Sequence, residues 1–148
     1  MKKVLRFTTI LFELITLSAL MAHLLALPAK MKLTREDYYT VQSIYSGWAW
    51  LGIFEIGALL LTLIWAISER NKKGIFSLLI IAFIFFAVSL TLFFIFTFPA
   101  NTATVNWTHR TDNWQMLRQQ WEYSHAARTI LNLIGFSCLM ISLLKNKN

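Results

Sequence analysis

Six large polar or aromatic side chains recur at helical spacing toward the C-terminal end of the chain. They are Trp114, Arg118, Trp121, His125, Arg128 and Asn132. Their intervals of four, three, four, three and four place all six on one stripe of a continuous helix. Residues 130–144 are nearly all apolar, so this stripe would enter a membrane. Polar groups at that depth need partners inside the protein.

The residue types on this stripe fit recognition of a small planar or anionic molecule. Arg118 and Arg128 can donate hydrogen bonds to phenolate, carboxylate or quinone oxygens, and Trp114 and Trp121 can stack on a flat ring. His125 is the candidate catalytic residue, because an imidazole exchanges a proton near neutral pH. The alternative is an interfacial anchor, in which the tryptophans contact lipid headgroups. Asn132 lies too deep for that role, which favours a wall facing other helices.

Further ionisable residues lie in the other apolar segments. We expect Glu55 to pair with Arg128, His125 or His23, because an unpaired carboxylate at that depth costs several kcal/mol. His23 and Glu55 are therefore candidate binding residues, with a purely structural ion pair or hydrogen bond as the alternative for each. Glu13 lies nearer the other end of the helices, and its role stays open. No helix carries the His-x-x-x-His pair of metal-binding helices, and the nearby Arg128 would oppose a cation, so we predict no metal site.

The composition predicts the elements that would position these residues. Of 148 residues, 57% are hydrophobic, 15% aromatic and 14% charged, which is typical of a multi-pass integral membrane protein. Apolar runs at about 4–27, 47–67, 75–98 and 125–144 predict an all-α bundle of four transmembrane helices. Pro28 and Pro99 mark the expected ends of the first and third helices. We expect one integral membrane domain over residues 1–148, located in the cell membrane.

The sequence also predicts that the polar connections between the helices are ordered. Thr34 followed by Asp37 resembles a capping box and predicts a helix that starts near Arg35. We expect the polar connection between the third and fourth helices, residues 100–113, to be ordered over the outer end of the bundle. The glycines at positions 47, 52 and 57 are interpreted as sites of close helix packing. The only cysteine, Cys138, excludes an intrachain disulfide.

The basic residues read as topology signals, which excludes nucleic acid as a partner despite the net charge of +7. With both termini in the cytoplasm, that side holds Lys2, Lys3, Arg6, Arg70, Lys72, Lys73, Lys145 and Lys147. The other side holds Lys30, Lys32, Arg35, Arg110, Arg118 and Arg128, spread over longer connections. The lipid bilayer and a small hydrophobic or anionic molecule are the expected partners, and an oligomer stays possible.

Three stretches of the sequence resemble a known family. FPANTATVNW and NWQMLRQQWEYSHAAR are similar to the anthrone oxygenase-like family of small four-span membrane proteins. HLLALPAKMKLTREDYYTVQSIYSGWAWLGI is similar to the first loop and second helix of its bacterial members. The most specific residues of the resemblance are Asn101, Trp107, Trp114, Arg118, Trp121, His125 and Arg128. The resemblance adds Asn101 and Trp107 to the candidate binding residues.

The resemblance implies a four-helix membrane protein without a bound cofactor. Fungal members are associated with oxidation of an anthrone to an anthraquinone, and many bacterial members have no assigned activity. The expected function is therefore a small-molecule redox or binding protein, with a cofactor-independent oxygenase of phenolic or quinone-like compounds as the leading form. In it His125 takes a phenolic proton, and Arg118 and Arg128 stabilise the anion.

Other functions stay open or are excluded. The alternatives are a non-enzymatic lipid- or quinone-binding accessory subunit and a small transporter. A continuous polar file from Glu13 to His125 would favour transport, whereas a dry inner half would disfavour it. The chain carries no nucleophile elbow, phosphate loop or dinucleotide fingerprint, which excludes hydrolase, kinase and nicotinamide chemistry.

Overall fold

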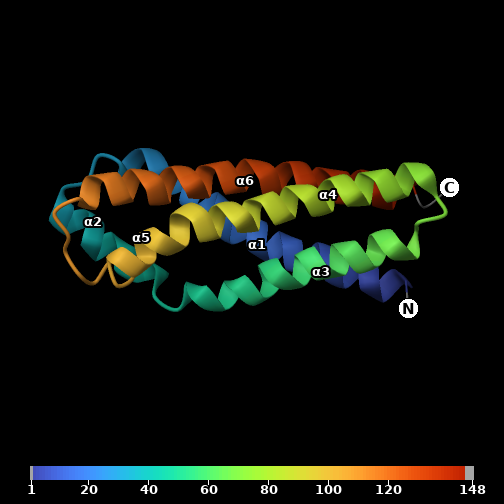
Figure 1. The fold of residues 1–148 in the computed structure, drawn as a ribbon, viewed down its shortest axis with the longest axis horizontal. Helices are drawn as coiled ribbons and strands as arrows, with labels where there is room; N and C mark the ends of the chain where they lie inside the picture. Colours follow the sequence, from blue (N-terminus) through green and yellow to red (C-terminus); the bar gives the residue numbers. More distant parts are fainter. Residues whose placement is uncertain (1, 146–148) are drawn as a thin grey trace.

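The computed structural model describes residues 2–145, and in this range the chain is helical without strands (Figure 1). The elements in chain order are α1 (Lys2–Lys30), α2 (Arg35–Gln42), η1 (Ser43–Tyr45), η2 (Trp48–Leu51), α3 (Gly52–Ser68), α4 (Lys73–Leu92), η3 (Phe93–Thr97), α5 (Phe98–Ala103) and α6 (Trp114–Lys145). Lys147, one of the basic residues used for the topology prediction, lies outside the described residues. The all-α prediction is confirmed.

Four helical segments are long and apolar enough to cross a membrane, as predicted. They are Lys2–Lys30, Trp48–Ser68, Lys73–Ala103 and Trp114–Lys145. Their outward-facing side chains are apolar, and Ile53, Leu60 and Ile84 are each more than half exposed. Apolar surface that extends over whole helices is costly in water and is typical of contact with lipid.

Both prolines that were expected to end helices lie inside them, so the predicted ends at 27 and 98 are wrong. Pro28 falls in the last turn of α1, which continues to Lys30. Pro99 lies in the first turn of α5, after the π-helical segment η3. There the N–H of Phe98 donates to the carbonyl of Phe93, five residues back. A widened turn accommodates a ring that has no N–H to donate, so the helix continues through the proline.

The predicted cap of the short helix is confirmed. Thr34 is the N-cap of α2, and its Oγ1 accepts a hydrogen bond from the Asp37 N–H at 3.2 Å. The same hydroxyl donates to Asp37 Oδ2 at 2.7 Å. This reciprocal arrangement satisfies a free N–H at the helix start. It fixes where α2 begins and therefore how α2 lies over the end of the bundle.

The four long segments pack side by side, and both ends of the described chain lie at one end of the bundle (Figure 1). Helix α6 packs against α1 and α4, and α3 packs against α1 and α4. Near the termini the interior is an apolar cluster around Trp65, Leu79, Phe86 and Leu139. At the opposite end the core is an aromatic cluster of Tyr38, Tyr39, Ala100, Trp107, Leu117 and Trp121.

Only one of the three glycines near the start of α3 has the packing role expected of it. A Cβ on Gly57 would lie 2.5 Å from Cδ2 of Phe12, so α1 and α3 approach closely there. Gly47 instead has a φ of +84°, which a turn before η2 requires and which glycine adopts at low cost. A Cβ on Gly52 would meet no described atom within 4 Å.

Candidate functional site

A cavity of about 640 Å³ lies in the half of the bundle away from the termini. It is bounded by α1, α3, α6, the η1–η2 segment, the η3–α5 segment and the connection after α5. Its lining includes seven of the ten candidate residues, namely His23, Glu55, Asn101, Trp107, Trp121, His125 and Arg128. This volume falls in the range of small-molecule sites, and the mixed aromatic and polar lining is typical of them.

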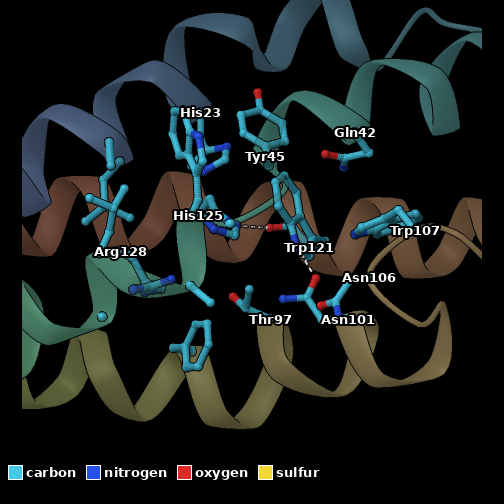
Figure 2. Close-up of a pocket in the computed structure, with 18 of the residues that line it drawn as sticks. His23, Gln42, Tyr45, Thr97, Asn101, Asn106, Trp107, Trp121, His125 and Arg128 are labelled. Carbon is cyan, nitrogen blue, oxygen red and sulfur yellow. Dashed lines mark hydrogen bonds between the residues drawn. The ribbon is translucent and has the colours of Figure 1, made fainter.

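Two histidines face each other on the cavity wall (Figure 2). The ring centroids of His23 and His125 are 4.2 Å apart, and that of Trp121 lies 4.9 Å from His23 and 4.1 Å from His125. Nδ1 of His125 donates to the Trp121 carbonyl at 2.9 Å, because a carbonyl only accepts. In the neutral ring this leaves Nε2 as an acceptor, and Nε2 has no hydrogen-bond partner among residues 2–145.

Two more aromatic rings contact His23 and complete a cluster of five rings. The ring centroids of Tyr45 and Trp48 lie 4.4 and 5.5 Å from His23, and 5.0 Å from each other. Burial, and then the nearby Glu122 carboxylate, raise the pKa of Tyr45 to about 12. The Tyr45 hydroxyl therefore stays protonated at neutral pH and can donate a hydrogen bond. We call the five rings of His23, Tyr45, Trp48, Trp121 and His125 the aromatic cage.

An ion pair lies beside the aromatic cage on the cavity wall, and it confirms the predicted partner of Glu55. Nη2 of Arg128 lies 2.9 Å from Oε1 and 2.8 Å from Oε2 of Glu55, and both side chains are nearly buried. The guanidinium also lies 4.9 Å from the ring of Phe93. Arg128 is the one lining residue of the Lys or Arg type among the described residues, and its charge is already met. The cavity is therefore less cationic than the sequence predicted.

Trp121 is held in place from the third segment. Its Nε1 donates to Oδ1 of Asn101 at 2.8 Å. In the turn after α5, Trp107 contacts Trp121 with ring centroids 6.1 Å apart. Asn101 and Trp107, suggested by the family resemblance alone, thus meet the stripe of α6 at the same indole. The turn after α5 brings this part of the chain back against Trp121 of α6.

That turn has an unusual backbone. Val105, Asn106 and Trp107 have φ values of 49°, 54° and 64°, in the left-handed region. Such a conformation is costly for a β-branched residue such as valine. The N–H of Trp107 is bonded to Oγ1 of Thr104 at 3.0 Å, which holds the turn. The result is that Trp107 is buried against the cavity while Asn106 reaches its rim.

Three stripe residues do not line the cavity, so the structure does not group the candidate binding residues Trp114, Arg118 and Asn132 with Trp121, His125 and Arg128. Nη1 of Arg118 donates to the Leu33 carbonyl at 3.0 Å, and its guanidinium lies 4.6 Å from the Trp114 ring. Asn132 lies on the other side of the cavity, and its Nδ2 donates to Oγ of Ser89 at 2.6 Å. The stripe is too long for one small cavity, because Trp114 and Arg128 are separated by about 21 Å along the helix.

A buried ionic network next to the cavity was missed by the sequence analysis. Nζ of Lys30 lies 2.8 Å from Oε1 of Glu122, with 3% and 0% of the two side chains exposed. The Tyr38 hydroxyl donates to the same oxygen at 2.9 Å, and Nε2 of Gln42 donates to the Tyr38 hydroxyl. Burial, followed by the Glu122 charge, raises the pKa of Tyr38. Nζ of Lys30 also lies 4.8 Å from the Trp121 ring.

One signal for this network was present in the sequence. Glu122 lies four residues after Arg118 and three before His125, which puts it beside the same stripe. Lys30 carried no such signal, because Pro28 suggested that it belonged to a connection. The network matters for the site because its cation lies over the outer face of Trp121. It therefore helps to fix the orientation of the aromatic cage.

Glu13 lies outside the cavity lining. Its side chain is buried, at 1% exposure, and its Oε1 has no hydrogen-bond partner within residues 2–145. Thr16, one turn further along α1, does line the cavity. Among the described residues, no three His, Cys, Asp or Glu side chains are grouped so that they could hold a metal ion.

Comparisons of the chain with protein-family models, with curated proteins and with solved structures find no match. The resemblance to the anthrone oxygenase-like family therefore stays a prediction.

Proposed function

We propose that the chain is a multi-pass membrane protein whose cavity binds a small flat molecule with phenolic or quinone oxygens, and that His125 exchanges a proton with it. The observation that carries this proposal is the aromatic cage, which includes two imidazoles 4.2 Å apart on the wall of a 640 Å³ cavity. Tryptophan and tyrosine rings stack on flat ligands, and an imidazole beside them can accept a phenolic proton.

The hydrogen bond of His125 supports its role as the proton acceptor. Its Nδ1 is committed to the Trp121 carbonyl at 2.9 Å, so the neutral ring presents Nε2 as the acceptor. Because the carbonyl keeps its hydrogen bond after Nε2 is protonated, the ring does not need to turn. His23, whose Nδ1 is buried and without a partner in the described chain, lies next to it.

The charges of the cavity favour a ligand that arrives neutral. The sequence analysis allowed an anionic ligand as well as a neutral one, because Arg118 and Arg128 lie on the stripe. Arg118 is engaged with the Leu33 carbonyl, and Arg128 with Glu55. An anion would have to compete with the Glu55 carboxylate for Arg128, whereas a neutral phenol or quinone would not. The buried Nε of Arg128 has no hydrogen-bond partner among the described residues.

The oxygenase activity that the family resemblance implies can use this arrangement. Deprotonation of a hydroxyanthrone by His125 makes an electron-rich anion that reacts with dioxygen. The ring methylene becomes a carbonyl, one atom of dioxygen enters that carbonyl, and the other leaves as water with the two methylene hydrogens. Dioxygen is the oxidant, and the carbon is oxidised by four electrons, so the reaction balances without a cofactor.

The geometry favours binding or turnover over transport. The cavity lining reaches Thr16 on α1 and Glu55 on α3, and the end of the bundle near the termini is filled by the apolar cluster around Trp65 and Leu139. A route through the molecule would have to open that cluster. We further propose that the termini face the cytoplasm, because short basic segments collect at that end, and that the ordered connection 104–113 covers the cavity from outside.

The test compares two histidines in purified protein in nanodiscs, with a hydroxynaphthoquinone as the probe. We expect wild type to quench its tryptophan fluorescence and to show the absorption band of the ionised probe. His125→Gln should bind but lose the ionised band, because an amide does not accept a proton near neutral pH. The control is His109→Gln, an exposed residue of the connection, which should keep both signals.

The outcomes separate binding from proton transfer. Absence of quenching in wild type would reject the ring-binding proposal. An ionised band that persists in His125→Gln would reject His125 as the acceptor. With a hydroxyanthrone under air, His125→Gln should lower product formation by about 100-fold or more. If wild type forms no product, the oxygenase activity is rejected, and the non-enzymatic binding subunit is the function that is left.

A further inference from the structure

The cavity has two openings that differ in polarity. At the end of the bundle its rim is formed by polar residues that are also exposed, namely Ser43, Ser46, Asn106 and Thr108. On the side of the bundle, Ile56 of α3 and Phe94 of η3 line the cavity and are 46% and 55% exposed. A residue that both lines a cavity and faces outward marks an opening. The first opening is polar and the second is apolar.

The two edges of the side opening lie at the same depth along the helices. Ile56 follows Trp48, the start of its span, by eight residues, and Phe94 precedes Ala103, the end of its span, by nine. At about 1.5 Å per residue, these positions are roughly 12 and 14 Å from the ends of the two spans. A hydrocarbon core is about 30 Å thick, so the side opening faces acyl chains when the spans cross a membrane.

Helix η3 is held on the side away from α3, which keeps the opening free. Oγ1 of Thr97 is bonded to Oγ of Ser124 at 2.8 Å, and the Phe96 carbonyl accepts from Nε2 of Gln120 at 2.8 Å. Both bonds tie the π-helical segment to α6. The side chains next to the opening, Ile53 and Phe98, are 57% and 51% exposed and are apolar as well.

We propose, resting on the ring-binding function above, that the ligand is a lipid-soluble amphiphile with a ring and a hydrocarbon tail. The ring lies in the cavity against the aromatic cage, and the tail leaves through the side opening between Ile56 and Phe94 into the bilayer. The polar opening then connects the ring oxygens with water, where protons exchange. A tail in the polar opening would expose hydrocarbon to water at about 0.8 kcal/mol per CH₂ group, whereas a tail in lipid would not.

The test compares two quinones with the same ring, 2,3-dimethoxy-5-methylbenzoquinone with and without a ten-carbon chain. Affinities for wild type and variants are measured in nanodiscs of one lipid composition, so that partition of the tailed compound into lipid cancels between proteins. We expect Ile56→Trp, which narrows the side opening, to weaken the tailed quinone by about tenfold. The tailless quinone should be unaffected within about twofold.

The matched control is Leu60→Trp. Leu60 is 54% exposed one turn further along α3, but it does not line the cavity. This variant should leave the affinities for both quinones unchanged. Equal effects of Ile56→Trp and Leu60→Trp, or an equal loss of both quinones with Ile56→Trp, would overturn the proposed route of the tail.

A second measurement uses wild type and does not depend on how a variant folds. A quinone with a diazirine at the end of its tail should, on illumination, label residues near 53–56 and 93–98. Labelling of residues 43–46 and 105–109 instead would place the tail in the polar opening and overturn the inference. If wild type binds neither quinone, the ring-binding function fails together with the inference. If it binds the tailless quinone but labelling misses the side opening, only the inference fails.

Discussion

Two glutamates in the interior of the bundle differ in how their charge is met. Glu55 is paired with Arg128 at 2.8 Å, whereas Oε1 of Glu13 has no hydrogen-bond partner within residues 2–145. Removal of one member of a buried ion pair leaves an uncompensated charge, which is strongly destabilising. Replacement of a carboxyl group that makes no pair removes no such interaction. The same substitution should therefore have different effects on stability at the two positions.

We predict that Glu55→Gln lowers the free energy of unfolding by about 3–5 kcal/mol, because Arg128 is left without its partner. Glu13→Gln should leave the free energy of unfolding unchanged or raise it. The measurement is unfolding of the purified protein in mixed micelles with increasing SDS, followed by circular dichroism. An equal loss for both variants would show that Glu13 makes a stabilising interaction after all.

The two buried ion pairs differ in how far the sequence predicts them. The Glu55–Arg128 pair could be predicted because both residues lie deep in apolar segments, where a lone charge is costly and only a few partners exist. The Lys30–Glu122 pair could not, because Pro28 placed Lys30 outside the first helix. In the structure α1 continues to Lys30 and carries its ammonium group into the interior.

At the scale of the elements, hydropathy located all four long helices but gave their ends less well. Pro99 was taken as a stop, yet η3 provides a wider turn in which the helix continues to Ala103. Periodicity placed the stripe on one face of a continuous helix, and the structure has one helix over this range. It could not say which neighbour each residue meets, because Arg118 faces the carbonyl of Leu33 while His125 faces the cavity. Tertiary packing decides that.

Helix contacts explain why one glycine of α6 is needed. A Cβ on Gly135 would lie 2.4 Å from Cε1 of Phe86. The side chain of Phe86 is only 2% exposed and is packed in the apolar cluster. The ring has little room to move, so α4 and α6 would have to separate. Close approach of backbones at small residues is a common means of helix packing in membranes.

We therefore predict that Gly135→Ala lowers the free energy of unfolding by about 1–3 kcal/mol, as overpacking usually does. The control is Gly52→Ala at the start of α3, where a Cβ would meet no described atom within 4 Å. That variant should be neutral or slightly stabilising, because alanine favours a helix more than glycine does. Both are measured by the SDS titration. A neutral Gly135→Ala would mean that Phe86 can repack.

At the scale of the whole molecule, the two halves of the bundle have different tasks. The half near the termini is closed by apolar packing around Trp65, Leu79 and Leu139. The other half holds the cavity, two buried ion pairs and a strained turn after α5. Buried polar groups and strained backbone reduce stability and gather at functional sites. The apolar half thus stabilises a fold whose other half holds the cavity for which we propose ligand binding.

This division also predicts the orientation in the membrane. The loop between α3 and α4, which contains exposed Asn71, lies at the same end as the termini, and exposed His109 lies at the cavity end. Positive segments usually stay in the cytoplasm, so the basic segment from residue 70 to 73 predicts that this end of the bundle is cytoplasmic. In a Cys138→Ser background, a membrane-impermeant maleimide should label His109→Cys in intact cells. It should label Asn71→Cys only after the membrane is opened, and the reverse pattern would place the cavity toward the cytoplasm.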